Sequence, residues 1–334
     1  MKWTRFGKIV ALMVVLSGLP MPHGPGDPGT ATAYDLPGLN LGLTSFLDGG
    51  PPAGPGLYFT QYFNYYHSGR LADRNGGRAL PSFAGETLNV YLFLSQFIYQ
   101  SNHDVLLGGK WGLDFIIPVV VTDLSYSMAL PGFPQDNGAG LGDILVGPFL
   151  QWDPVPLGGS GPLFMHRFEL QMLFPTGKYD HDREINPGSN FFSFDPYWAA
   201  TIFITPRWEF STRVHYLWNT RNNDPNRSYI NADGTPAGST LAGQAVHLNF
   251  ASSYEVVEKM LHVGVNGYYL KQTTDTHVDG ESIAGSKEQV FGIGPGLVFH
   301  WSQDTHFFVN VYFETAAENR PEGQRYNFRL VHHF

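Results

Sequence analysis

The residue types that most often perform chemistry show no recognisable catalytic pattern in this chain. Its 334 residues include no cysteine, which excludes disulfides, thiolate metal sites and thiol catalysis. The motifs of serine hydrolases, zinc proteases and phosphate-binding loops do not occur. Asp180-His181-Asp182 either binds a cation through oxygen and imidazole ligands or forms a solvated acidic loop. We expect no enzymatic activity, no cofactor and no metal.

Charged residues inside the apolar stretches recur instead at every second position. Between residues 207 and 218, Trp208 and Trp218 share one face with other aromatic residues, and Glu209 and Arg213 lie on the opposite face. Alternation of this kind is the period of a β-strand, whose side chains point to opposite sides in turn. The polar faces therefore form one surface and the apolar faces another.

If the apolar faces meet lipid, the polar faces line an interior. The expected lining residues are Arg167, Glu169, Arg207, Glu209, Arg213, His215, His306, Asn310, Glu314, Arg325 and Arg329. Because they carry both signs of charge, they do not form a selective funnel for anions or cations. They either pair across strands and brace the wall or take part in transport.

We count twelve segments with this alternation. They are approximately residues 57–67, 86–99, 105–121, 142–152, 163–174, 191–203, 206–218, 241–254, 260–271, 287–301, 305–315 and 325–334. Most reach the ~9–11 residues that a tilted strand needs to cross a bilayer. Only 15% of the residues are charged and 15% are aromatic, which suits lipid-facing strands better than a soluble domain with about 25% charge.

The connections between these segments alternate between short and long. The five short ones are residues 100–104, 153–162, 204–206, 255–259 and 302–304, and the six long ones are 68–85, 122–141, 175–190, 219–240, 272–286 and 316–324. Outer-membrane barrels have short periplasmic turns and long external loops. The sequence therefore predicts an all-β fold, a transmembrane antiparallel barrel of about twelve strands over residues 57–334, with both termini on the periplasmic side.

The first 33 residues have the three parts of an export signal. A basic start is followed by a short apolar run, then by helix-breaking prolines and an Ala-Thr-Ala cleavage site at residues 31–33. Residues 34–56 follow and are rich in Gly, Pro and Leu without strand periodicity. They form either a small plug inside the barrel or a loose periplasmic tail.

Aromatic residues on the interior side, together with those near two long connections, suggest an affinity for poorly soluble molecules. The candidates for contact with a hydrophobic ligand are Tyr91, Phe93, Phe133, Phe191, Phe203, Phe308 and Tyr312. The alternatives are packing near the barrel ends and an aromatic girdle at the membrane surface. Gly292, Gly294 and Gly296 also fall on the interior side, where they either leave room or mark a bend.

Two short motifs and the C-terminus carry a resemblance to a known family. GLGDI at residues 140–144 opens the fourth segment, PTGKY at residues 175–179 closes the fifth, and the last strand ends in Phe334. With their spacing, these features resemble the "putative MetA-pathway of phenol degradation" family, whose members are outer-membrane barrels related to the long-chain fatty-acid transporters. The resemblance implies uptake of aromatic or other hydrophobic compounds and a structural role for the two motifs.

We therefore expect a passive channel of the outer membrane for small hydrophobic or aromatic compounds. The alternatives are a general porin for small solutes and a barrel that displays its loops without transporting anything. The expected partners are outer-membrane lipid and lipopolysaccharide, hydrophobic solutes, and the assembly machinery, which would recognise Phe334. A net charge of −9 argues against nucleic-acid binding.

Overall fold

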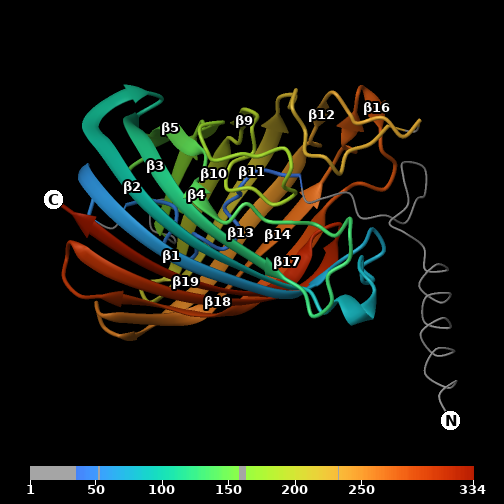
Figure 1. The fold of residues 1–334 in the computed structure, drawn as a ribbon. Helices are drawn as coiled ribbons and strands as arrows, with labels where there is room; N and C mark the ends of the chain where they lie inside the picture. The colour runs from blue at the N-terminus through green and yellow to red at the C-terminus, as the bar shows by residue number, and fades with distance from the viewer. Residues whose placement is uncertain (1–34, 52, 158–162, 232) are drawn as a thin grey trace, which may run out of the picture.

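The chain folds into a closed antiparallel β-barrel, as the alternating segments predict (Figure 1). The structure is a computed structural model that describes residues 35–51, 53–157, 163–231 and 233–334. The barrel closes because β1 (Gly56–Leu71) pairs with β2 (Thr87–Leu106) on one side and with the last strand, β19 (Pro321–His333), on the other. The predicted export signal, residues 1–33, lies outside the described residues.

Twelve strands span the barrel wall, and three of them are interrupted. The fourth is β4 (Ala139–Leu141) with β5 (Ile144–Gln151), the fifth β7 (Leu163–Glu169) with β8 (Met172–Phe174), and the sixth β9 (Ser193–Phe194) with β10 (Tyr197–Thr205). The others are unbroken: β1, β2, β3 (Gly109–Ser125), β11 (Trp208–Asn219), β13 (Ala245–Val257), β14 (Leu261–Gln272), β17 (Gln289–His300), β18 (Thr305–Glu318) and β19. The short strands β6 (Val155–Pro156), β12 (Thr240–Leu241), β15 (His277–Val278) and β16 (Glu281–Ser282) lie in connections.

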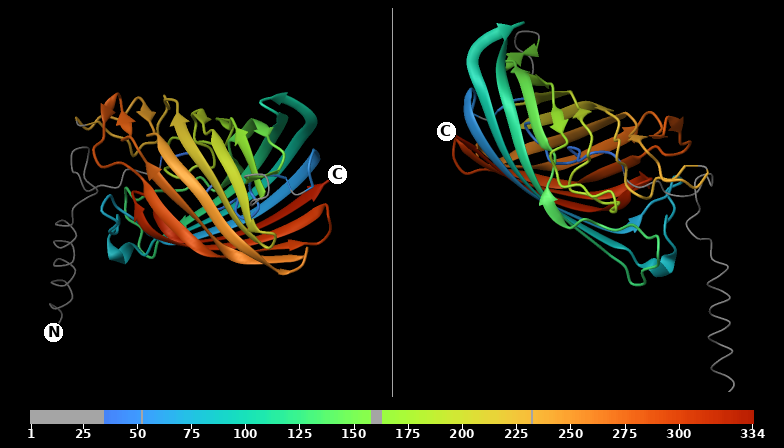
Figure 2. Two further views of the ribbon diagram at one scale, coloured as in Figure 1. Left: turned by 180° about the vertical axis from the view of Figure 1, so that it is seen from behind. Right: turned by 45° about the horizontal axis from the view of Figure 1, so that its top comes forward.

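The connections define two different ends of the barrel, which we call the loop end and the turn end. The turn end holds short links such as residues 107–108 and 301–304, and the C-terminus lies there (Figures 1 and 2). The loop end holds long connections, which include the small β12–β15–β16 sheet. The expectation of a long loop at residues 316–324 is wrong. Strands β18 and β19 include most of these residues, and only Asn319 and Arg320 separate the two strands.

The two faces of each strand differ as the period-two pattern predicts. On β11, Trp208 and Phe210 are 44% and 41% exposed, whereas Glu209 and Ser211 are buried. The exposed face is apolar because it meets hydrocarbon, and every backbone N–H and C=O within that layer needs a partner inside the protein. A closed sheet provides those partners.

The described residues contain no α-helix, and the 3-10 turn η1 (Ser82–Ala84) lies between β1 and β2. No helix in that part of the chain is both long and apolar enough to cross a membrane.

Residues 35–51 and 53–55, which we call the plug, lie inside the barrel. The plug starts at the loop end, where Thr276 donates a hydrogen bond to Asp35, and it ends at the turn end, where Gly56 pairs with Gln100. These contacts place the described part of the segment between the two ends of the barrel. The first and last residues of the barrel lie together at the turn end, as expected, because Phe334 donates a hydrogen bond to the carbonyl of Leu57, whereas Asp35 lies at the opposite end.

This path predicts which side of the membrane each end faces. Gly38 is exposed and an added Cβ there would meet no atom within 4 Å, so Gly38→Cys should fold normally in this cysteine-free chain. A polar maleimide too large for general porins should label Gly38→Cys in intact cells. It should label Ser302→Cys, in a turn-end link, only after the outer membrane is permeabilised. Labelling in the reverse order would contradict the path.

Candidate functional site

The apolar side chains of the plug fill the space that the barrel leaves open. Leu36 and Leu41 pack with Tyr312 and Leu217 of the wall near the loop end. Further along, Phe46 is fully buried against a second group of wall residues that includes Phe308. Burial of apolar surface of this kind stabilises the plug by about 25 cal/mol for each Å² removed from water.

Glycines in the wall make room for Phe46. Gly264 on β14 and Gly296 on β17 are directly opposite each other in the sheet. A Cβ on Gly264 would lie 2.9 Å from the Phe46 ring, and a Cβ on Gly296 would lie 2.8 Å from it. Gly292 leaves space in the same way for the ring of Tyr268. Of the three interior glycines predicted from the sequence, Gly292 and Gly296 therefore provide room for side chains, whereas Gly294 lies close to the backbone of Val311 on the next strand.

Polar contacts hold the plug to one side of the interior. Asp48 accepts two hydrogen bonds from Arg213, at 2.7 and 2.8 Å, and both side chains are buried. Asn249 accepts a hydrogen bond from the backbone N–H of Gly42 at 2.8 Å, and Asn327 donates to the carbonyl of the same glycine. These partners lie on β11, β13 and β19.

The opposite side of the interior is aliphatic, and we call it the aliphatic wall. It consists of the inward residues Leu88, Val90, Leu92 and Leu94 of β2, Ile116, Pro118 and Val120 of β3, Leu145 of β5 and Leu173 of β8. The plug meets this wall through Leu43, which packs with Leu94 and Tyr62. The interior is thus divided between a polar side that holds the plug and an apolar side.

Ten of the eleven polar residues expected to line the interior point inward. They are Arg167, Glu169, Glu209, Arg213, His215, His306, Asn310, Glu314, Arg325 and Arg329. Several brace the wall: Tyr197 donates to Glu169 at 2.6 Å, and Tyr66 and Tyr268 both donate to Glu314 at 2.7 Å. The guanidinium of Arg329 lies 3.6 Å from the centre of the Phe308 ring. These contacts match the bracing alternative.

Arg207 does not join this interior group. It lies in the link between β10 and β11 with a half-exposed side chain, and its nearest carboxylates are those of Glu255 and Glu258 at 3.8 and 3.7 Å. The strand pattern extended one residue too far into the turn, where the alternation of faces no longer applies.

The structure corrects the placement of two aromatic candidates. Tyr91 and Phe93 face outward on β2, where Tyr91 stacks on Tyr65 and Phe93 packs on Phe63. Both faces of β2 are apolar, so composition could not reveal its inner side. The inward residues are instead the leucines and valine of the aliphatic wall.

The remaining aromatic candidates occupy three different places. Phe308, Tyr312 and Phe191 are buried against the plug or its neighbours. Phe133 lies in a long connection, where its ring packs on Tyr126. Only Phe203 borders an open cavity.

That cavity has a volume of about 830 Å³ and lies at the turn end. Its apolar lining comes from the wall and the plug: Phe203, Met165, Trp152, Trp301, Leu47, Pro51 and Pro55. Gln100 of β2 also lines it and, by the period of two, shares the inward face of Leu88 and Leu94. Between Leu94 and Gln100 on this face lies Gln96, which donates a hydrogen bond to the buried Asp114 of β3 at 2.7 Å, so one polar pair separates the aliphatic wall from the cavity.

Sequence reasoning missed Asp48, Gln151 and Asn249 as interior residues. Asp48 stands among Gly, Pro and Leu without periodicity, and an isolated acidic residue there gives no sign of its partner. Asn249 lies at an inward position of a predicted strand, so the alternation itself could have found it. The loop candidate Asp180-His181-Asp182 is exposed, and His181 lies 3.4 Å from the carboxylates of Asp182 and Asp224.

The two sequence motifs meet at the start of β5. Asp143 accepts hydrogen bonds from the backbone N–H groups of Gly177 and Ser189, at 2.9 and 2.8 Å. Gly177 and Gly188 approach so closely that an added Cβ on either would clash with the backbone of the other. Asp143 thus fixes the junction between two strands and a long connection, which is a structural role.

Comparisons with known proteins agree with this architecture. A model of the family described as "Putative MetA-pathway of phenol degradation" matches residues 68–330. The chain belongs to this family. The resemblance inferred from the two motifs is therefore confirmed, and so is the barrel fold. No curated protein matches the chain significantly.

One solved structure supports the fold, and two others are more distantly similar. The COG4313 outer membrane channel from Pseudomonas putida F1 is 15% identical with a TM-score of 0.67, covering 86% of this chain and 97% of that one. The β domain of the Bordetella autotransporter BrkA is 11% identical with a TM-score of 0.45, covering 84% and 100%. The CymD monoaromatic hydrocarbon channel is 8% identical with a TM-score of 0.42, covering 85% and 91%.

The ion pair between Asp48 and Arg213 predicts how firmly the plug is held. Asp48→Asn should leave the buried guanidinium without its counter-charge, at a cost of roughly 3–5 kcal/mol. We expect more frequent and larger openings in planar-bilayer recordings. Arg70→Gln, which breaks a more exposed pair with Glu322, is the matched control and should conduct like the original protein. Identical traces for Asp48→Asn would show that this pair does not hold the plug.

Asp35 predicts a dependence of plug docking on pH. Burial raises the pKa of the Asp35 carboxyl from 3.8 to about 6, so the docked segment binds a proton more tightly than the released one. Docking should be strongest below about pH 4 and weaken between pH 4 and pH 6. Bilayer recordings should show more openings at pH 7 than at pH 4, and Asp35→Asn should reduce that difference. If Asp35→Asn shows the same difference in openings between pH 7 and pH 4 as the original protein, other titratable groups cause that difference.

Proposed function

We propose that this barrel is a passive outer-membrane channel for small aromatic or other hydrophobic compounds, which it moves down their gradient without transforming them. The observation that carries the proposal is the aliphatic wall along β2 and β3, with a largely apolar cavity at the turn end beyond the Gln96–Asp114 pair. The name of the family, and that of the hydrocarbon channel among its structural neighbours, point the same way.

The division of the interior suggests how a solute passes while the plug stays in place. The hydrogen bonds of Asp48, Gly42 and Gly49 bind the plug to polar residues of the wall. On the aliphatic side its contact is Leu43, an apolar side chain. A hydrophobic solute can replace that contact without leaving any polar group unpaired, so the barrier is low. A hydrated sugar or ion has no such substitute partner.

The cavity at the turn end would receive the solute next. Its volume of about 830 Å³ is within the range of ordinary ligand pockets, about 300–1,000 Å³. Aromatic and aliphatic side chains from the wall and the plug line it together with polar ones such as Gln151, His300 and His306, and the turn-end links would open it toward the periplasm.

A general porin is the second candidate, and the mixed charges on the polar side favour it. Those charges are, however, engaged with one another, with tyrosines or with the plug. A channel for hydrated solutes would use them as water-facing groups. The proposed hydrophobic path therefore fits the interior better.

The barrel surface suggests its other partners. Its exposed aromatic face would contact outer-membrane lipid and lipopolysaccharide. Phe334 ends the last strand and is 71% exposed at the turn end, where we propose that the assembly machinery recognises it. The export signal in residues 1–33 remains a prediction.

A charge placed in the cavity tests the proposed path. Phe203→Glu should reduce the uptake rate of labelled toluene several-fold in cells whose own copy of the gene is deleted, because a hydrocarbon cannot solvate the new carboxylate. Phe203→Leu keeps the lining apolar and should retain most of the uptake. The amount of folded barrel in cells that express each variant is measured by its heat-modifiability on gels, and cells with equal amounts are compared.

Liposome swelling with arabinose separates the two candidates. A hydrophobic channel should give little swelling with the original protein, because arabinose does not pass through it. Rapid swelling, together with toluene uptake that is the same for both Phe203 variants and the deletion strain, would favour the general porin.

A further inference from the structure

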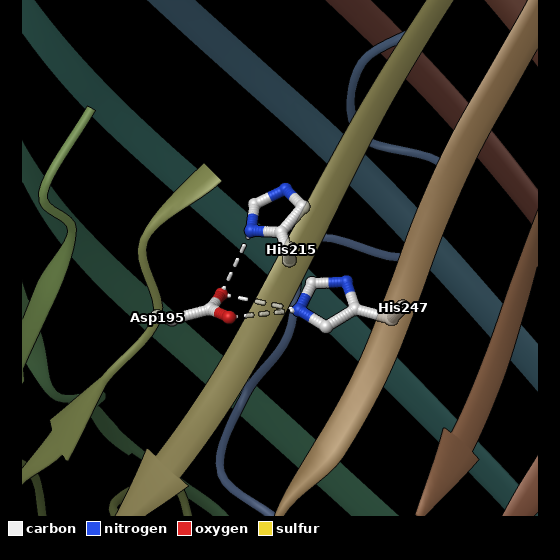
Figure 3. A group of neighbouring side chains, drawn as sticks. All are labelled: Asp195, His215 and His247. Carbon is white, nitrogen blue, oxygen red and sulfur yellow. Dashed lines mark hydrogen bonds and ion pairs between the residues drawn. The ribbon is translucent and has the colours of Figure 1, made fainter. Parts of the chain in front are cut away.

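Three interior residues outside the proposed path form a compact group with metal-binding side chains. They are Asp195, His215 and His247, and all are at most 1% exposed (Figure 3). His215 on β11 and His247 on β13 are directly opposite each other in the sheet. Asp195 lies between β9 and β10, two residues before Tyr197, which pairs with His215. Three neighbouring strands therefore contribute one side chain each.

The geometry of the group is convergent. His215 Nδ1 lies 3.0 Å from Asp195 Oδ2, and His247 Nε2 lies 3.1 Å from both carboxylate oxygens. The two imidazoles stack with centroids 4.1 Å apart, so both ring nitrogens approach the carboxylate from one side. Figure 3 shows these atoms turned toward one another. Two ligands bound about 2.1 Å from one ion, at tetrahedral or octahedral angles, are themselves about 2.9–3.4 Å apart.

The charge of the group favours a cation. In the described part of the chain, the ion-pairing partners of Asp195 are these two histidines, with no lysine or arginine. The neighbouring cation, Arg213, is committed to Asp48. A buried carboxylate is costly without a positive partner. A divalent ion supplies that charge without requiring a protonated imidazole.

The far nitrogen of each histidine ring faces no hydrogen-bond acceptor among the described residues. His215 Nε2 and His247 Nδ1 are buried and have no hydrogen-bond partner among the described residues. Asp195 alone therefore decides which nitrogen of each ring carries the proton. If an ion replaces the two hydrogen bonds, the near nitrogens present their lone pairs to it and the protons move to the far nitrogens.

We propose that Asp195, His215 and His247 bind one divalent transition-metal ion of the zinc class. Two imidazole nitrogens and one carboxylate oxygen suit Zn²⁺, Co²⁺, Ni²⁺ or Fe²⁺, whereas Ca²⁺ and Mg²⁺ prefer sets made of oxygen. All three side chains are fully buried, and an ion bound to them would join the interrupted strand β9–β10 to β11 and β13. Leu217 and Ala245, two residues from the histidines, pack in the same cluster as Leu41 of the plug.

Metal analysis of the purified full-length barrel, without a histidine tag, tests this assignment. After treatment with a chelator and addition of ZnCl₂, gel-filtered protein should retain about one Zn²⁺ per chain. Co²⁺ should give visible d–d absorption that Zn²⁺ abolishes. The folded band on gels should persist to a higher temperature with Zn²⁺ than with chelator.

Two conservative variants keep the hydrogen bonds but remove the ligands. His215→Asn places an amide nitrogen near the position of Nδ1, and His247→Gln places one near Nε2, so both can still donate to Asp195. Each should fold and lose the retained Zn²⁺, the Co²⁺ spectrum and the thermal shift. His67→Asn, on the outer face of β1, is the matched control and should keep all three. Absence of retained Zn²⁺ in the original protein, or equal retention by both variants, would overturn the proposal.

Discussion

The need to pair every backbone polar group within hydrocarbon determines the rest of this structure. A sheet meets that need only when its first and last strands join, as β1 and β19 do. Closure with twelve strands creates an interior wider than side chains alone can fill, since about eight strands already leave only enough space for side chains. The plug follows from that geometry, because its leucines and Phe46 occupy space that would otherwise be water against apolar wall residues.

Period-two alternation made the barrel predictable from sequence, and it placed most of the polar interior correctly. It works where the two faces differ in chemistry, as on β11, where Glu209 opposes Trp208. It failed on β2 because leucines occupy one face and aromatic residues the other, and lipid accepts both. Which of them turned inward depended on β1 and β3, whose registers fix the pairing of Leu94 with Tyr62 and Pro118.

The plug and the Asp195 group could not be read from the chain for a different reason. The plug has no periodicity because it is neither strand nor helix, and its order comes from contacts with wall residues more than 150 positions away, such as Arg213 and Asn249. Asp195 precedes the two histidines by 20 and 52 residues, a spacing that matches no metal motif. Only the register of three neighbouring strands brings these side chains together.

The separation of polar and apolar contacts within one narrow interior resolves a conflict between holding the plug and passing a solute. If polar bonds held the plug on all sides, any solute would have to break them, and each broken bond would leave a buried group unpaired. Here such bonds lie mainly toward β11, β13 and β19, whereas Leu43 meets the aliphatic wall. Apolar contacts are exchangeable because they have no fixed direction. On the proposed path, an apolar molecule would therefore move past on the aliphatic side while the plug stays docked and blocks ions.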